Sequence, residues 1–121
     1  MQRRSSSSVR ISYPKFDREH VIKKILERLP EVELRLPLKL IVLFGSYAKG
    51  NYTAASDIDL LVVYSGKRRE DAYAQVKKVI DVRGLEPHIY SISEYKKLVK
   101  NIKNMTKDGI VLLDHMSKRR K

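Results

Sequence analysis

The amino-acid sequence predicts an α/β (α+β) domain in which helices pack on one small mixed β-sheet. Short apolar runs that suit buried strands alternate along the chain with segments whose apolar residues recur at helical spacing. The chain has 121 residues, 42% of them hydrophobic and 33% charged, as expected for one globular domain with a single core. Alternating helices and strands of this kind indicate a layered arrangement.

The N-terminal half is predicted to contain one helix and two strands. Apolar residues at helical spacing follow Asp17, which is a suitable N-cap, and Pro30 is expected to end this helix. Residues 31–37 are interpreted as a connector. The apolar runs at 38–44 and 57–64 predict the two strands, because each is too short for a helix.

The C-terminal half is predicted to contain two more helices and two more strands. A helix is expected over 70–82, with Gly84 as its C-cap glycine. The run at 86–92 predicts a third strand, since proline is tolerated near a strand start. A single helix is expected over 93–102, and the short apolar run at 109–113 predicts a final strand.

Composition excludes several classes of protein. The chain has no cysteine, which rules out disulfides and thiolate metal sites. No apolar run is long enough to cross a bilayer, and the N-terminus lacks the apolar core of a signal peptide. The sequence therefore predicts a cytoplasmic protein with no membrane partner.

Much of the positive charge lies at the two ends of the chain. The net charge is +12, and seven cations in acid-free stretches at the two ends account for more than half of it. We interpret residues 1–13 as a flexible basic head, 14–114 as the domain and 115–121 as a basic tail. Such ends are either simply solvated, or they attract RNA or an acidic partner.

A glycine-serine turn follows the first predicted strand, and two aspartates begin the second. The turn has the sequence GSYAKG over 45–50, and its backbone N–H groups and the Ser46 hydroxyl are suited to hold a phosphate. Asp57 and Asp59 stand two residues apart, so in a strand they point to the same face. Neighbouring carboxylates repel unless a cation lies between them, and their oxygens favour Mg²⁺ or Mn²⁺. Together these features predict chemistry on a nucleoside triphosphate.

Each half of this pattern also has a purely structural interpretation. Most Gly-Ser sequences are ordinary turns, and acids are unremarkable on the solvated face of an edge strand. However, Leu61 and Val63 continue the aspartate face with apolar side chains. The acids therefore mark one end of an otherwise buried strand, which favours a site at the rim of a core.

Glu86 and His88 form a second pair at positions i and i+2, on the third predicted strand. Glu86 would complete a cluster of three carboxylates if the two strands lie side by side. The alternative is an exposed residue before a proline. His88 is either a ligand or, more commonly for a strand histidine, a partly buried residue held by hydrogen bonds.

The motif over Leu38–Val63, with both glycines and both aspartates in register after a strand, resembles the signature of the DNA polymerase beta-like nucleotidyltransferase superfamily. Within that superfamily the chain resembles the prokaryotic minimal nucleotidyltransferases, many of which pair with a helical HEPN-domain protein in toxin–antitoxin modules. The order of elements extends the resemblance to residues 20–114. It implies a polymerase beta-like nucleotidyltransferase fold.

The resemblance also implies a role for each motif residue. Gly45 and Ser46 would bind the phosphates of ATP or another nucleoside triphosphate. Asp57 and Asp59 would be catalytic and would hold two Mg²⁺ ions, for which Mn²⁺ can substitute. Glu86 would be the third catalytic and metal-binding acid. The chain departs here from the commonest pattern, which has aspartate at this place, and a displacement of 1 Å can cost about 100-fold in rate.

The activity implied is metal-dependent transfer of a nucleoside monophosphate, AMP from ATP, to a hydroxyl of a partner protein, by the antitoxin of a two-gene module. Two alternatives stay open. One is a non-catalytic antitoxin that neutralises a HEPN-like partner by binding alone, and the other is an RNA-directed nucleotidyltransferase, suggested by the basic ends. Because no acceptor-binding segment is apparent after residue 114, we expect a partner to supply the acceptor.

Overall fold

A computed structural model describes residues 17–116, so the predicted head and most of the predicted tail lie outside the described residues. The elements are α1 (Arg18–Arg35), β1 (Leu38–Phe44), α2 (Ser46–Lys49), β2 (Ile58–Tyr64), α3 (Ala72–Ile80), β3 (Leu85–Ser91), α4 (Ile92–Lys97), α5 (Val99–Met105) and β4 (Ile110–Asp114). One four-stranded sheet has the order β3-β2-β1-β4. The pair β2–β3 is parallel, and β1 is antiparallel to both β2 and β4. The predicted mixed sheet is therefore confirmed.

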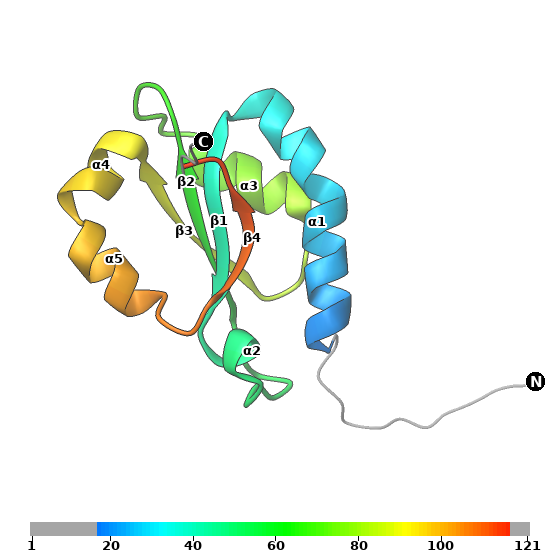
Figure 1. Cartoon of the computed structure of the whole chain (residues 1–121). Coiled ribbons are helices and arrows are strands. Elements are labelled where there is room, and N and C mark those ends of the chain that lie inside the picture. Colours follow the sequence, from blue (N-terminus) through cyan, green and yellow to red (C-terminus); the bar gives the residue numbers. More distant parts are fainter. Residues whose placement is uncertain (1–16, 117–121) are drawn as a thin grey trace, which may run out of the picture.

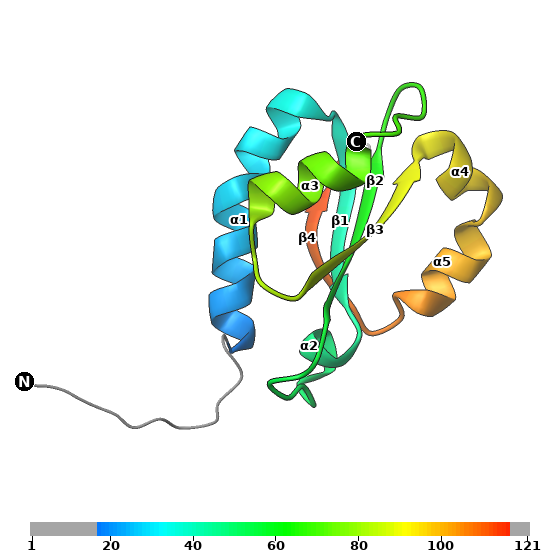
Figure 2. The same cartoon turned by 180° about the vertical axis from the view of Figure 1, so that it is seen from behind.

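The sheet is covered on both faces. Helices α1 and α3 lie on one side, and α4 and α5 lie on the other (Figures 1 and 2). Two buried clusters correspond to these sides: Ile58, Leu60 and Val62 of β2 pack with α1 and α3, whereas Leu61 and Val63 pack with α4 and α5. The alternation of side chains along a strand produces this division, and it places the aspartate face of β2 on the α4–α5 side.

Helix α1 begins where the sequence predicts but ends later. Asp17 is the N-cap, and its side chain accepts a hydrogen bond from the backbone N–H of His20. The expectation that Pro30 ends the helix is wrong, since α1 continues through it to Arg35. The extra turns bury Val32 and bring Leu36 into the core, and this apolar burial outweighs the hydrogen bond that proline removes.

Other predicted boundaries are corrected in the C-terminal half. Helix α3 ends at Asp81, whose backbone has the left-handed conformation, and not at Gly84 as predicted. Gly84, with φ +83°, instead turns the chain into β3. The predicted single helix over 93–102 is two helices that begin after Ser91 and break at Leu98. Ser91 is the N-cap because it forms a reciprocal capping box with Glu94. Within residues 17–116, none of these helices is long and apolar enough to cross a membrane.

Candidate active site

The motif residues meet at one end of the sheet, where β1 ends and β2 and β3 begin. In the strand register Phe44 of β1 lies opposite Asp59 of β2, and Asp59 lies beside Glu86 of β3. The predicted strand over 57–64 began one residue too early: β2 begins at Ile58, so Asp57 lies in the preceding loop and is exposed. Parallel pairing of β2 with β3 therefore brings Asp59 and the Glu86–His88 pair to the same end of the sheet.

Gly45 makes the closest backbone approach in the site. It has φ +78° and precedes the four-residue helix α2. A Cβ added to Gly45 would lie 2.4 Å from Oδ2 of Asp59, so the Asp59 carboxylate would have to move from its position. Glycine is thus required twice over, once for the backbone conformation and once because the Asp59 carboxylate lies against the turn.

Helix α1 holds the glycine-serine turn in place. The guanidinium of Arg18 donates to the carbonyl of Ala48 at 2.8 Å, and the Arg18 backbone N–H donates to the Tyr52 hydroxyl. Tyr47 is buried and its ring stacks on that of Tyr52, with centroids 4.2 Å apart. Burial raises the pKa of the Tyr47 hydroxyl. These contacts give the turn a fixed position beside the strand ends.

His88 contacts the Asp59 carboxylate directly. Its Nε2 lies 3.2 Å from Oδ1 of Asp59, and both side chains are about two-thirds buried. The other side of the imidazole packs near the Phe44 ring, with centroids 5.0 Å apart. Of the two interpretations of His88, the structure supports the partly buried, hydrogen-bonded histidine. Asp59 is therefore held on one oxygen by His88 and faces Gly45 with the other.

Glu86 lies beside Asp59 in the register, but its carboxylate contacts a different element. Oε2 of Glu86 accepts a hydrogen bond of 3.4 Å from the Tyr73 hydroxyl of α3. Within the part of the chain that the structure describes, no three His, Asp or Glu side chains gather closely enough to hold a metal ion. The predicted three-carboxylate cluster is thus not assembled here, and the role of Glu86 stays a prediction.

The carboxylates of this edge have the chemistry that a hard divalent cation requires. Asp57 is exposed and Asp59 is partly buried, so the rim of the core offers oxygen ligands that are close in sequence. Because Gly45 has no Cβ, Oδ2 of Asp59 can lie directly against the glycine-serine turn. Asp57 and Asp59 would hold the cation, with Glu86 as the proposed third ligand.

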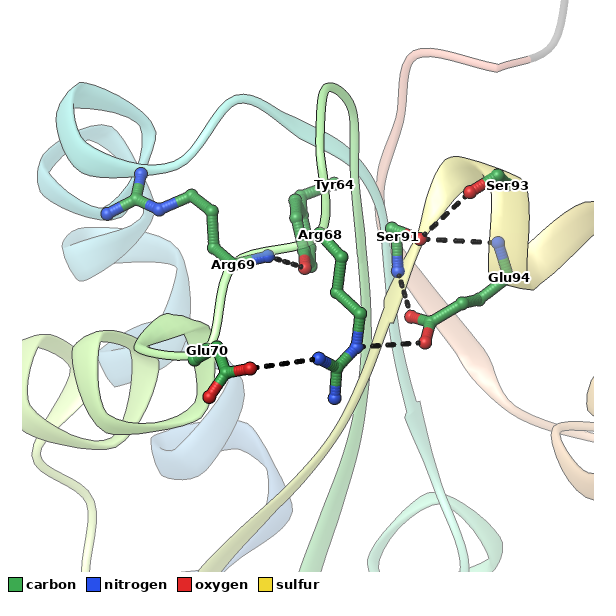
Figure 3. Close-up of polar contacts among 7 residues, drawn as sticks. All are labelled: Tyr64, Arg68, Arg69, Glu70, Ser91, Ser93 and Glu94. Carbon is green, nitrogen blue, oxygen red and sulfur yellow. Dashed lines mark hydrogen bonds and ion pairs between the residues drawn. The ribbon is translucent and has the colours of Figure 1, made fainter.

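The opposite end of the sheet carries a second polar cluster (Figure 3). Arg68 extends from the β2–α3 loop to Glu70 at 3.6 Å and to Glu94 at 3.2 Å. Ser91 is fully buried, and its backbone N–H donates to Glu94. This bond is the main cause of the lowered pKa of the Glu94 carboxyl. The cluster joins a loop to the start of α4.

A cavity of about 200 Å³ lies within this second cluster, lined in part by Arg68, Arg69 and Tyr64. Its two guanidinium groups are already bound, Arg68 as described and Arg69 to Asp71 at 2.9 Å. The Arg69 hydrogen bond lowers the pKa of the Asp71 carboxyl. The Tyr64 hydroxyl accepts from the Arg69 backbone. Groups that bind one another in this way act as structural links between elements.

Sequence reasoning found the acids and the glycine, noted Tyr52 only as a residue near the motif, and gave no role to Arg18 or Tyr73. These three act through contacts between residues 13 to 34 positions apart in the chain. Arg18 follows a helix N-cap and carries no motif of its own, so only the packing of α1 against α2 identifies it. For Tyr52, position near the motif was the only available signal.

Comparison with known proteins identifies the family. The model of the nucleotidyltransferase domain family matches residues 20–113. A candidate protein adenylyltransferase of Methanocaldococcus jannaschii is 49% identical over 45 residues, which are 37% of this chain and 44% of the relative. The matched segment thus spans less than half the length of that relative.

Solved structures agree in fold. A candidate nucleotidyltransferase from Sulfolobus solfataricus has a TM-score of 0.55 at 23% identity, covering 78% of this chain and 80% of the other. A structure of a tri-AMPylated Shewanella oneidensis HEPN toxin in complex with MNT antitoxin matches with a TM-score of 0.51 at 21% identity, covering 80% and 72% of the two chains. These similarities confirm the predicted polymerase beta-like nucleotidyltransferase fold.

Proposed function

The chain belongs to the nucleotidyltransferase domain family, and from that premise we propose that it transfers AMP from ATP to a hydroxyl of a partner protein, in a metal-dependent reaction, as the antitoxin of a two-gene module. The observation that carries the proposal is the contact between the Gly45 turn and Asp59. It brings a backbone suited to phosphate against a carboxylate suited to a cation. The names of the Methanocaldococcus and Shewanella proteins support the choice of AMP and of a protein acceptor.

In the proposed reaction the acceptor hydroxyl attacks the α-phosphorus of ATP, a phosphorus–oxygen bond forms to the acceptor, and the bond to pyrophosphate breaks. Gly45 and Ser46 would bind and orient the phosphates. Asp57 and Asp59 would hold Mg²⁺, which when bound stabilises negative charge on the attacking and leaving oxygens. Glu86 would accept the proton of the attacking hydroxyl. His88 would keep the Asp59 carboxylate in one orientation through the 3.2 Å contact.

The first test is labelling of a protein partner. The chain is incubated with radiolabelled ATP, Mg²⁺ and a co-expressed helical HEPN-domain protein. We expect label on the partner, and a loss of about 100- to 1,000-fold in Asp59→Asn, since groups that stabilise transition-state charge have effects of this size. Glu27→Gln, on the exposed face of α1, is the control and should label at the wild-type rate. A partner that is neutralised equally by Asp59→Asn, with no label in either case, would instead establish a non-catalytic antitoxin.

The second test separates Glu86 from Tyr73. If Glu86 acts on the attacking hydroxyl, Glu86→Gln should lower transfer by about 100-fold or more while ATP binding stays within about 2-fold. Glu86→Asp should retain activity. Tyr73→Phe removes the recorded hydrogen bond but leaves the carboxylate, so it should not slow transfer. Equal losses in Glu86→Gln and Tyr73→Phe would show that Glu86 matters only as a link to α3.

A further inference from the structure

The excess positive charge of the described domain is concentrated in one segment. Residues 17–116 contain 18 lysines and arginines and 14 acidic residues. Five of these lysines lie within residues 95–107, which contain no acid, so the other 13 cations face all 14 acids. We call these five residues the lysine surface: Lys96, Lys97, Lys100, Lys103 and Lys107. Outside it the described domain is close to neutral.

The lysine surface is exposed and has no acid of its own. All five side chains are exposed on α4, on α5 or just after it, and no ion pair is recorded for them within residues 17–116. Two acids border the segment: Asp108, which is exposed and directly follows Lys107, and Glu94 of α4, which is bound by Arg68 and by the Ser91 backbone (Figure 3). Five like charges on two consecutive short helices and just after them repel each other. That repulsion would be relieved by an anionic partner.

The position of this surface relates it to the active site. Helices α4 and α5 cover the sheet face that carries Asp59, His88 and Phe44 (Figure 1). After α5 the chain returns to the end of β1: a Cβ on Gly109 would lie 2.9 Å from the carbonyl oxygen of Leu43. The lysine surface thus runs towards the strand end from which the glycine-serine turn begins.

An exposed apolar residue distinguishes between two kinds of anionic partner. Leu98, at the break between α4 and α5, is 41% exposed and directly follows Lys97 in the sequence. An apolar centre with a charged rim is typical of protein interfaces. Single-stranded RNA is usually bound with exposed aromatic rings that stack on bases, whereas Tyr95, the one aromatic residue of the segment, is buried. The observations favour a protein.

We propose that the lysine surface docks an acidic protein surface around Leu98, and that this protein is the acceptor of the nucleotidyl group. The second clause rests on the proposed function, and the first does not. Lysines at the rim would steer an acidic partner onto the face, and Leu98 would contact an apolar side chain of that partner. A protein seated there lies on the same side of the sheet as Asp59.

Binding is tested first, without ATP or metal. The probes are a fluorescent amphipathic helical peptide with leucines bordered by glutamates, and a single-stranded RNA of equal charge. The variant carries Lys97→Glu, Lys100→Glu and Lys103→Glu. The control makes the same charge change on the opposite side of the sheet, where Lys23, Lys78 and Arg83 are exposed. We expect the variant to bind the peptide about 10-fold more weakly, because reversing rim charges replaces attraction by repulsion. The peptide affinity of the control should change by less than about 2-fold.

Leu98→Ser tests the apolar contact, and we expect it to weaken peptide binding about 3-fold without changing RNA binding. The proposal is overturned if the wild-type chain does not bind the peptide, if variant and control lose affinity equally, or if RNA binds more tightly than the peptide through the same lysines. In the labelling assay, the triple variant should lower transfer to the HEPN-domain protein about 10-fold with unchanged ATP affinity. If the chain binds the peptide but shows no transfer, the proposed function is contradicted and the proposal of a docking surface is still supported.

Discussion

The two ends of the sheet carry polar clusters of opposite character. At the end of β2 and β3, Arg68, Glu94 and Ser91 bind one another through recorded hydrogen bonds and ion pairs. At the start of the same strands, Asp57 is exposed with no hydrogen bond recorded within residues 17–116, and Asp59 has one oxygen against a glycine. Mutually satisfied groups stabilise a fold. Carboxylate oxygens that accept no recorded hydrogen bond within residues 17–116 are available for a ligand. This difference between the two ends locates the candidate site.

Among variants that test this difference between the two ends, Gly45→Ala is expected to have the largest effect on stability and on transfer. The new Cβ would collide with Oδ2 of Asp59 and would also occupy a positive-φ position, so we expect a loss of about 1–3 kcal/mol in the free energy of unfolding and of about 100-fold in transfer. Gly66→Ala is the matched control, because Gly66 has φ +93° and no atom within 4 Å of the added Cβ. It should lose stability only. Denaturant titration and the labelling assay measure both quantities, and wild-type transfer in Gly45→Ala would show that the close approach is irrelevant to the site.

A smaller effect is expected at the other end from Ser91→Ala. The hydroxyl of the fully buried Ser91 accepts the N–H of Glu94 at the start of α4, and loss of such an N-cap costs about 1 kcal/mol. Thermal unfolding should reveal this loss, and transfer well below the melting temperature should not change. Ser93→Ala, on the exposed neighbour, should cost less. A strong loss of transfer in a folded Ser91→Ala protein would contradict the conclusion that this end of the sheet is structural only.

The smallest effect is a pH dependence at Glu94. The Ser91 backbone N–H is the main cause that lowers the Glu94 carboxyl pKa in the folded chain. A carboxyl with a lowered folded pKa contributes stability above its ordinary pKa and loses it as the pH falls through the lower folded value. The difference in unfolding free energy between wild type and Glu94→Gln, under about 1 kcal/mol at pH 7 for so exposed a group, should therefore vanish in acid. A difference that is constant over that range would mean that the ionised carboxylate contributes nothing.

Sequence reasoning was most reliable where the physical signal is local. The Asp17 N-cap depends on residues within one helical turn. The strand over Leu38–Phe44 follows from an apolar run that only Lys39 interrupts. The prediction of a turn at Gly45 follows from the glycine and serine next to each other directly after that strand. Boundaries were less secure: Pro30 is a local stop signal, and the burial of Val32 and Leu36 overrode it.

The sequence by itself determined the fold class, the acids and glycine of the candidate site, and the excess of lysine over acid in residues 95–107. Only the tertiary structure decided that β3 lies parallel to β2, with Glu86 beside Asp59 in register. It also decided that His88 binds Asp59 while the Glu86 carboxylate contacts Tyr73. The physical reason is distance along the chain: these partners are 13 to 29 residues apart, and strand pairing and side-chain packing, not spacing in the sequence, bring them together.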